Sequence, residues 1–339
     1  MEAAAANDRL KVRAVLAAVA ALVLAGLALA RAPAPADPAA VAPAAPSATD
    51  TPPEVAPKAD YDAATRADQI GRVVVPVMIN GQGPFSFALD TGANRTVLTP
   101  HLAQRLGLVV SSDDKVTMNG TTGSADVGTV LVEKVAAGDV TLIDQNLPVA
   151  SALTNDIDGV LGVDGLTAKR VMVDFKTGKI EIRNSRFEGP LPGAPRLSAQ
   201  LRFGRLMVVD AYVERTRVKA VIDTGSEYTL GNPALYAALQ DPSHARVQYP
   251  AVEVRGQTLD VQPGERWPVV AIKVGNVNAI HFPIVFGRFY IFHLWKLESQ
   301  PAVVIGMDLM SRLDKLVLDY QRREVQMLAE PRHDQFVFQ

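Results

Sequence analysis

The sequence repeats itself once, with a shift of 133 residues. Residues 87–92 read FALDTG and residues 220–225 read AVIDTG, and after each triplet come a threonine and a leucine and then a short proline-led apolar segment. Two Asp-Thr-Gly triplets in register do not arise by chance in a chain of 339 residues. An internal repeat of this kind predicts two folding units of the same design.

Further matches follow in the same order along both copies. The matching pairs are 138–140 with 275–277, 147–149 with 282–284, 160–162 with 304–306, 173–175 with 318–320, and 180–182 with 325–327. We therefore expect two homologous halves at residues 70–189 and 197–330, joined by an interlobe linker at 190–196. Residues 331–339 are predicted to be a tail.

Short β-branched runs dominate both halves. Residues 73–79 are one such run, and Asn80 and Gly81 follow it as a turn signal. Helical periodicity is confined to short segments, at residues 100–106 and 233–239. The pattern predicts an all-β protein with short helices.

The N-terminus has the features of an export signal. Three basic residues, Arg9, Lys11 and Arg13, precede seventeen apolar residues at 14–30. By the positive-inside rule, such a segment sends the following chain across a membrane. Residues 1–31 are therefore expected to be a cleaved signal peptide or a membrane anchor, with a buried core helix as the third alternative.

Residues 32–69 are predicted to be a disordered linker rich in proline and alanine. The stretch 32–60 holds eight of the 23 prolines, a composition that favours polyproline II and buries little apolar surface. With the leader, this linker predicts a periplasmic or other extracytoplasmic protein, either secreted or tethered to the inner membrane.

Composition excludes several classes of function. Lys and Arg number 34 against 36 Asp and Glu, so no basic field exists to hold nucleic acid. The chain has no cysteine, and its five histidines do not fall at metal-ligand spacings. We expect no metal and no cofactor.

Asp90 and Asp223, the aspartates of the two triplets, are the candidate catalytic residues. Each follows an apolar strand, and the nearby Gly92 and Gly225 leave room for close backbone approach. Two like charges placed face to face share a proton. The ionised carboxyl can take a proton from water while the neutral one donates to a substrate carbonyl. The alternative interpretation is a pair of turn aspartates.

These residues resemble the aspartic proteases of the retropepsin-like and pepsin-like superfamily, in a single-chain bilobal form found in exported bacterial proteins. The apolar-apolar-glycine signature of that family stands at residues 160–162 and 304–306. The resemblance covers most of residues 70–330. Because the protein is expected outside the cytoplasm, it is also similar to periplasmic processing proteases of the PerP type. The resemblance implies two β-barrel-like lobes, a cleft between them and an extended polypeptide substrate. Thr91 and Thr224 are expected to hydrogen-bond across the interface.

Two departures from the family pattern lead to further expectations. Ala93 follows the first triplet and Ser226 the second. A hydroxyl at Ser226 is expected to hydrogen-bond the carboxylate of Asp223, which makes Asp223 the ionised member of the pair. The family's flap tyrosine is absent from both candidate flap segments, 118–124 and the weaker 254–258. The flap candidates are Asn119, Gly120, Thr121 and Gly123, with an ordinary hairpin as the alternative.

Residues 286–295 concentrate five of the chain's twenty aromatic residues. They are interpreted as core packing or a lid, with a substrate exosite or a bilayer contact as the alternatives.

The sequence thus predicts an aspartic endopeptidase that hydrolyses envelope or periplasmic proteins with water as the nucleophile. It is expected to act as a monomer, because one chain supplies both aspartates. The alternative is a catalytically silent peptide-binding module. A homodimer of single-lobe subunits is disfavoured by the duplication.

Overall fold

The folded body begins inside the predicted linker. The computed structural model describes residues 62–151, 154–240, 250–329 and 335–337, which belong to one compact unit. Strand β1 (Asp62–Ala64) pairs with β11 (Lys179–Asn184), and β2 (Arg66–Ala67) pairs with β3 (Val73–Ile79). Residues 62–64 and 66–67, which were expected to belong to the linker, are therefore strands of the fold. The predicted leader and the rest of the linker lie outside the described residues, within which no helix is long and apolar enough to cross a membrane.

The first half of the repeat forms an eight-stranded sheet in the order β5-β9-β4-β3-β7-β6, with β2 on β3 and β8 on β7. Its remaining strands are β4 (Gln82–Leu89), β5 (Val97–Leu98), β6 (Ser111–Asn119), β7 (Ser124–Ala137), β8 (Val140–Pro148) and β9 (Gly159–Leu161). Helix α2 (Pro100–Arg105) and the 3-10 helix η1 (Val163–Gly165) accompany it. Helix α2 begins at Thr99, whose hydroxyl accepts the backbone N–H of Leu102 at 3.2 Å, and Pro100 suits its first turn.

The second half forms a nine-stranded sheet with corresponding connections. Its order is β13-β14-β15-β20-β16-β19-β18-β17, with β23 on β19. The strands are β13 (Gln200–Arg202), β14 (Leu206–Val213), β15 (Thr216–Ile222), β16 (Leu230–Gly231), β17 (Ala251–Arg255), β18 (Val261–Val274), β19 (Val277–Phe286), β20 (Ala302–Ile305) and β23 (Gln335–Val337). Helices α3 (Pro233–Leu239), α4 (Tyr290–Leu294) and α5 (Met307–Met310) belong to this half. Residues 335–337 of the predicted tail are thus part of the fold, because β23 adds a parallel strand to β19.

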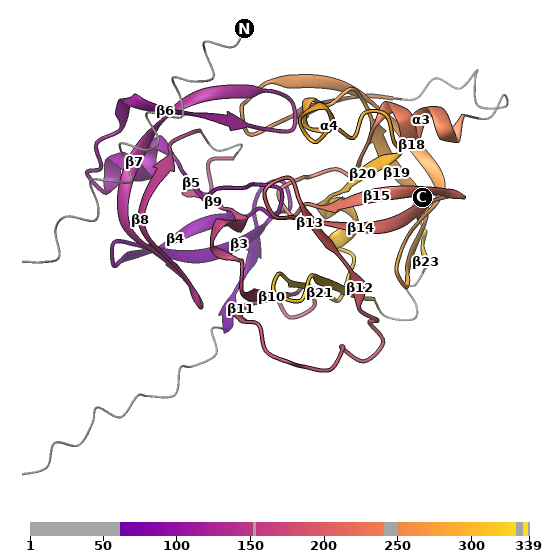
Figure 1. Ribbon diagram of the computed structural model, residues 1–339, viewed down its shortest axis with the longest axis horizontal. Coiled ribbons are helices and arrows are strands. Elements are labelled where there is room, and N and C mark those ends of the chain that lie inside the picture. The colour runs from indigo at the N-terminus through magenta and orange to yellow at the C-terminus, as the bar shows by residue number, and fades with distance from the viewer. Residues whose placement is uncertain (1–61, 152–153, 241–249, 330–334, 338–339) are drawn as a thin grey trace, which may run out of the picture. The chain divides into compact units, whose positions relative to one another are not determined.

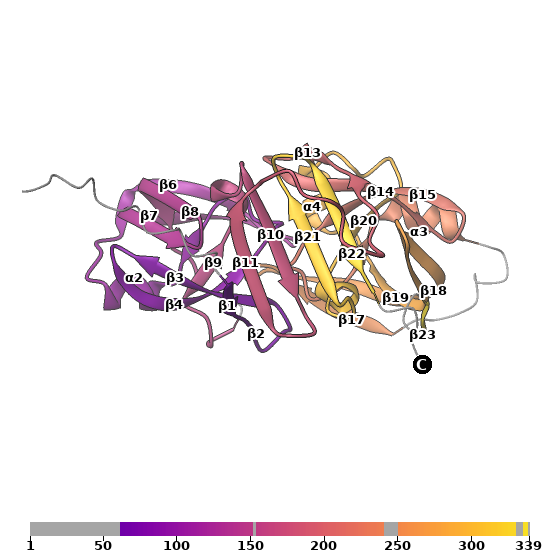
Figure 2. The same cartoon turned by 90° about the horizontal axis from the view of Figure 1, so that it is seen from below.

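A six-stranded sheet combines both halves. Its order is β1-β11-β10-β21-β22-β12, with β10 (Lys169–Asp174), β12 (Leu197–Ser198), β21 (Lys315–Asp319) and β22 (Glu324–Leu328). At its centre, β10 of the first half pairs antiparallel with β21 of the second, with Met172 opposite Val317. Figures 1 and 2 show these strands between the indigo-to-magenta and orange parts of the chain. Backbone hydrogen bonds therefore join the halves at a second place besides the connecting segment.

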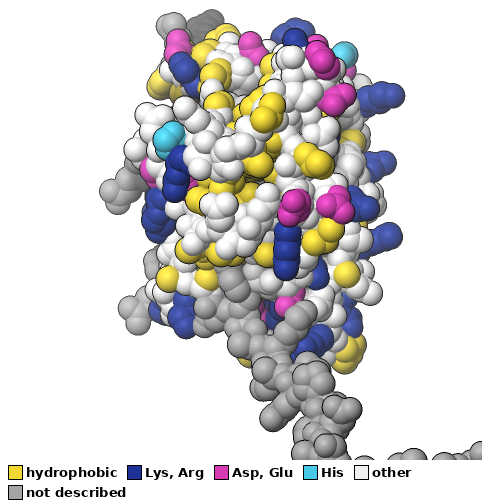
Figure 3. Space-filling model, turned by 90° about the vertical axis from the view of Figure 1, so that its left-hand side faces the viewer, with side chains coloured by type: hydrophobic (Ala, Val, Ile, Leu, Met, Phe, Trp, Pro, Cys, Tyr) yellow, Lys and Arg dark blue, Asp and Glu magenta, His cyan; other side chains and the backbone are white. Residues whose placement is uncertain are grey.

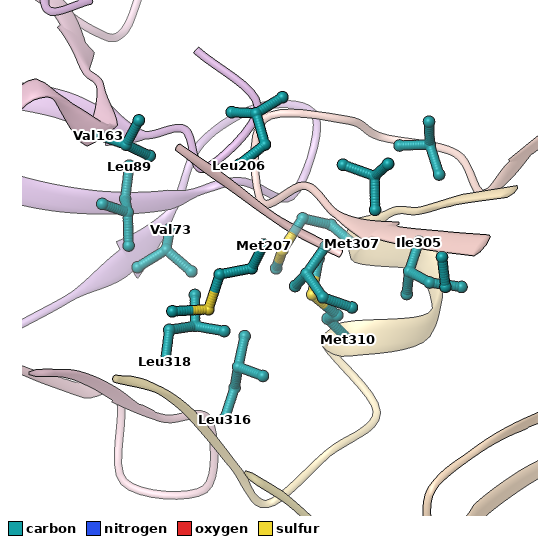
Figure 4. Packing of buried hydrophobic residues seen from close by; sticks show 14 of the residues in the cluster. Val73, Leu89, Val163, Leu206, Met207, Ile305, Met307, Met310, Leu316 and Leu318 are labelled. Atoms are coloured by element: carbon teal, nitrogen blue, oxygen red, sulfur yellow. The ribbon is translucent and has the colours of Figure 1, made fainter. Parts of the chain in front are cut away.

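The hydrophobic core is continuous across the two halves. One cluster of buried side chains includes Val73 and Leu89 from the first half and Met207 and Leu318 from the second. Figure 4 shows these side chains close together between the ribbons. Because both halves contribute to the same apolar cluster, we expect them to unfold together. The prediction of a mostly β protein is confirmed.

The outer strands of the first half have one buried and one exposed face. In β7, Val130 and Val132 are buried whereas Leu131 between them is exposed. Figure 3 shows this side of the molecule, where hydrophobic side chains are interspersed with polar and charged ones. Such alternation is typical of an antiparallel sheet with one face in solvent.

A buried ion pair secures the segment before β3. The carboxylate of Asp68 accepts the Nε–H of Arg72 at 2.7 Å, and both side chains have 0% exposure. The other carboxylate oxygen of Asp68, Oδ1, accepts the backbone N–H groups of Ile70 and Arg72 at 3.1 and 2.8 Å. A residue assigned to the linker is thus the counter-ion of a fully buried arginine.

Asp68→Ala should destabilise the protein by about 3–5 kcal/mol, because it leaves the guanidinium of Arg72 buried without its carboxylate. The measurement is urea unfolding of the full chain. Asp210→Ala is the matched control, since Asp210 pairs with Lys219 and Arg217 at the surface and should cost about 0–1 kcal/mol. Equal losses in the two variants would contradict the prediction.

Candidate active site

Asp90 and Asp223 occupy equivalent positions at the ends of β4 and β15. The backbone N–H of Asp90 donates to the carbonyl of Leu161 at 3.0 Å, and that of Asp223 donates to Ile305 at 3.1 Å. Leu161 ends β9 and Ile305 ends β20, each the parallel neighbour of the strand that carries the aspartate. The predicted apolar-apolar-glycine segments therefore lie directly beside the aspartates.

The two carboxyl groups meet at the interface between the halves. Each lies close enough to the other to change its pKa. The backbone N–H of Gly92 donates to Asp90 Oδ1 at 2.8 Å, and that of Gly225 donates to Asp223 Oδ1 at 2.9 Å. A Cβ atom added to Gly92 would overlap the carboxyl group of Asp223, and one added to Gly225 would overlap that of Asp90. Only glycine allows each loop to approach the opposite carboxyl this closely.

Thr91 and Thr224 form a reciprocal set of hydrogen bonds beneath the carboxyls. The backbone N–H of each threonine donates to the hydroxyl of the other, at 3.1 and 3.0 Å. The Thr91 hydroxyl donates to the carbonyl of Ile222 at 2.8 Å, and the Thr224 hydroxyl donates to Leu89 at 2.7 Å. Both side chains are fully buried. The structure thus places both threonines across the interface, as the sequence interpretation required.

In each half, a threonine and an aspartate further along the chain support the loop that carries Asp90 or Asp223. The carboxylate of Asp164 accepts the backbone N–H and the hydroxyl of Thr96, both at 2.8 Å. Asp308 accepts the same two groups of Thr229, at 2.9 and 2.7 Å. Burial raises the pKa of Asp308 to about 6.

These four residues were not identified from the sequence, although it contains the signal. A threonine stands six residues after each of Asp90 and Asp223, and an aspartate stands two residues after each of the glycines at 162 and 306. The hydroxyl of each threonine also accepts the backbone N–H of that glycine, at 3.3 and 3.2 Å. The pairs therefore connect the Asp-Thr-Gly loop of each half to its glycine segment.

Burial and mutual repulsion control the charge of the two carboxyls. Loss of hydration raises the pKa of both aspartates. The pKa of Asp223 lies well above its ordinary value, because the neighbouring charge of Asp90 adds to the effect of burial. The cation of Arg72 and the N–H of Gly92 counteract the effect of burial on the pKa of Asp90. The pair can therefore hold one proton and one negative charge.

The expectation for Ser226 is wrong. Its hydroxyl donates to the backbone carbonyl of Tyr228 at 2.7 Å and not to the carboxylate of Asp223. The loop turns the side chain toward its own backbone, where the carbonyl two residues on satisfies the hydroxyl. The reason given for an ionised Asp223 is thereby lost.

A cavity of about 430 Å³ lies over the two aspartates. Its lining includes Asn119, Gly120 and Thr121 from the hairpin tip between β6 and β7. Gly123, the fourth flap candidate, lies outside the lining and packs against the side chain of Asp260, where a Cβ atom would overlap the carboxylate. Three of the four flap candidates therefore line the same cavity as Asp90 and Asp223.

The hairpin tips of the two halves meet above this cavity. The Thr122 hydroxyl donates to the carbonyl of Asp260 at 2.7 Å and accepts the backbone N–H of Gly256 at 2.9 Å. Asp260 and Gly256 lie in the turn between β17 and β18, so the weaker flap segment at 254–258 is the partner of the stronger one. The two tips together roof the cavity.

Helix α4, which lies within the aromatic segment 286–295, hydrogen-bonds to the first tip, the hairpin tip between β6 and β7. The Tyr290 hydroxyl donates to Asn119 Oδ1 at 3.2 Å, and the Ile291 N–H donates to the carbonyl of Thr121 at 3.1 Å. Phe292 is buried in the core, whereas Ile291 and Trp295 line the cavity. The segment 286–295 thus serves both core packing and the wall of the site.

Comparison with known proteins finds a family similarity for the first half. A family model described as "Aspartyl protease" matches residues 75–164, which include Asp90, the first tip and the segment 160–162. A comparison with curated proteins found no match. The matched range covers the first triplet but not the second.

Thr91→Val and Thr224→Val should each lower the free energy of unfolding by about 2–5 kcal/mol, because each change leaves a buried N–H and a buried carbonyl without partners. Chemical denaturation of the full chain measures the loss. The matched control is Thr117→Val. The exposed hydroxyl of Thr117 donates to Asp126, and its loss should lower the free energy of unfolding by less than about 1 kcal/mol. The double threonine variant should lose less than the sum of the two single losses, because the threonines act as one network. Additive losses would argue against it.

Proposed function

We propose that this protein is an aspartic endopeptidase that uses Asp90 and Asp223 to activate water. The observation that carries the proposal is the close approach of two carboxyls, Asp223 buried and Asp90 half-buried, at the base of a roofed cavity. The family match of residues 75–164 to aspartyl proteases supports the same class.

The reaction needs one proton on the pair. The ionised carboxylate accepts a proton from water while the water oxygen bonds to the substrate carbonyl carbon, and the neutral carboxyl donates its proton to the carbonyl oxygen. The product of this step is a neutral gem-diol. Its breakdown transfers a proton to the amide nitrogen, breaks the C–N bond and returns a proton to the pair. Burial suits both roles, because it makes full ionisation of the two carboxyls costly.

The substrate in this proposal is a polypeptide in extended conformation. The cavity runs beneath two hairpin tips, whose backbone groups are suited to pairing with an extended chain. The tips are joined through Thr122, so a polypeptide enters only after the Thr122 contacts with Asp260 and Gly256 open. The tips then act as flaps that close over the substrate and exclude water.

One chain completes the site, so the active form is proposed to be a monomer of two lobes. Each half contributes one aspartate, one threonine and one hairpin tip to the same cavity. A second copy of the chain is not needed for any of these groups.

The protein is proposed to act outside the cytoplasm, on envelope or periplasmic proteins. This part of the proposal rests on the sequence of residues 1–60, with its basic flank, apolar run and proline-rich stretch. The leader either is removed or tethers the enzyme to the inner membrane.

Asp90→Asn and Asp223→Asn should each abolish cleavage while leaving the protein folded, because one carboxylate and one carboxylic acid are both required. The assay follows hydrolysis of an unbiased peptide library by the full chain. Asp210→Asn, a change at the surface, is the control and should retain wild-type activity. More than a few per cent of wild-type activity in either dyad variant would contradict the assignment of Asp90 and Asp223 as the catalytic pair. Peptide binding without hydrolysis by the wild type would indicate a silent binding module.

A reporter enzyme that is active only outside the cytoplasm, fused after Asp60, should be active in bacterial cells, because the leader carries the chain across the membrane. The N-terminal mass of the mature protein then separates a cleaved signal from an anchor. Activity of a cytoplasm-specific reporter at the same fusion point would contradict the proposed location.

A further inference from the structure

The two catalytic aspartates face different residues across their strand pairs. In the first half, β3 and β4 pair with Val74 opposite Ala88, and the same register two residues further places Arg72 opposite Asp90. In the second half, β14 and β15 pair with Val208 opposite Val221, and the register places Leu206 opposite Asp223. Directly opposed residues of an antiparallel pair point to the same face. The residue opposite Asp90 is therefore a cation, whereas the residue opposite Asp223 is a leucine.

Arg72 is held rigidly at this position. Its side chain has 0% exposure, and its Nε and Nη2 atoms both lie 2.7 Å from Asp68 Oδ2. Neither Nη atom has a hydrogen-bond partner among the described residues, and Nη2 contacts Asp68 only as an ion pair. The guanidinium is thus anchored on one side by Asp68, and its positive charge acts on Asp90 through buried surroundings, where charges interact strongly.

Another titratable group near both aspartates is Tyr320, which follows β21. Its side chain is 1% exposed, and its hydroxyl has no partner among the described residues. Burial and the two nearby carboxyls raise the pKa of Tyr320, so the phenol stays neutral. Of the groups behind the dyad, Arg72 and its counter-ion Asp68 therefore carry the charges, and the asymmetry between the aspartates originates there.

We propose that Arg72 is a positioning residue that keeps the negative charge of the pair on Asp90 and leaves the shared proton on Asp223. The inference rests on the proposed function and deepens it. It makes Asp90 the base that takes the proton from water, and it makes Asp223 the acid that protonates the substrate carbonyl. This order is the reverse of the one expected from Ser226.

The test replaces the ion pair without leaving a lone buried charge. In Asp68→Asn/Arg72→Leu, the asparagine oxygen can still accept the N–H groups of Ile70 and residue 72, and the leucine reproduces the side chain found opposite Asp223. The pH profile of kcat/KM is bell-shaped, and its acid limb reports protonation of the ionised carboxyl. Without the cation the pKa of Asp90 rises, so the acid limb should move upward by about one pH unit or more.

Two companion variants separate charge from packing. Arg72→Lys keeps a cation and should leave the acid limb close to that of the wild type. Arg170→Leu/Glu188→Gln removes another buried arginine, on β10 of the six-stranded sheet, together with its carboxylate partner. This change should not move the acid limb. An equal shift in Arg72→Lys, or no shift in Asp68→Asn/Arg72→Leu, would overturn the proposal. Asp68→Asn/Arg72→Gln replaces the leucine variant if that variant does not fold.

A second readout does not need activity. Carbon-13 labelling of aspartate carboxyls and NMR titration of Asp223→Asn gives the pKa of Asp90 alone, with and without Arg72. That pKa should rise when Arg72 is replaced, and the pKa of Asp223 measured in Asp90→Asn should change less. An unchanged pKa of Asp90 would refute the role of Arg72. A shifted pKa in a protein whose wild type cleaves no peptide would instead refute the proposed function alone.

Discussion

The reciprocal hydrogen bonds of Thr91 and Thr224 are the constraint on which the site depends. Each hydroxyl is bonded to the backbone N–H of the opposite threonine and to a carbonyl of the opposite half. Because all of these groups are buried, separation of the halves here would leave several polar groups without partners. The bonds hold the ends of β4 and β15 together, and the carboxyls that follow those strands come into contact as a result.

Around this constraint the halves repeat the same supporting parts. Each aspartate is bonded to the backbone beside its glycine segment, and each loop is held by a threonine and an aspartate further along the chain. Duplication alone would make the two carboxyls equivalent. In the proposed mechanism, acid and base catalysis needs them to differ, and the proposed source of the difference is the ion pair of Arg72 with Asp68, since the equivalent position of the second half holds Leu206.

The roof of the cavity shows the same combination of symmetry and specialisation. Two corresponding hairpin tips meet through Thr122, but only the second half adds α4, which bonds to Asn119 and Thr121 of the opposite tip. Phe289, Phe292 and Trp295 in and beside α4 are packed in the core, so the helix that bonds to the first tip is firmly anchored. The cavity wall and the position of the first tip therefore depend on the same short segment.

The sequence by itself determined the repeat, the mostly β character and the two Asp-Thr-Gly triplets, because short motifs and side-chain periodicity are local properties of a chain. Only the tertiary structure decided that residues 62–67 and 335–337 are strands, since their pairing partners lie far away in the sequence. It also turned the Ser226 hydroxyl away from Asp223 and set Arg72 opposite Asp90. Strand register and the direction of a side chain in a loop follow from long-range pairing, which leaves no local pattern in the sequence.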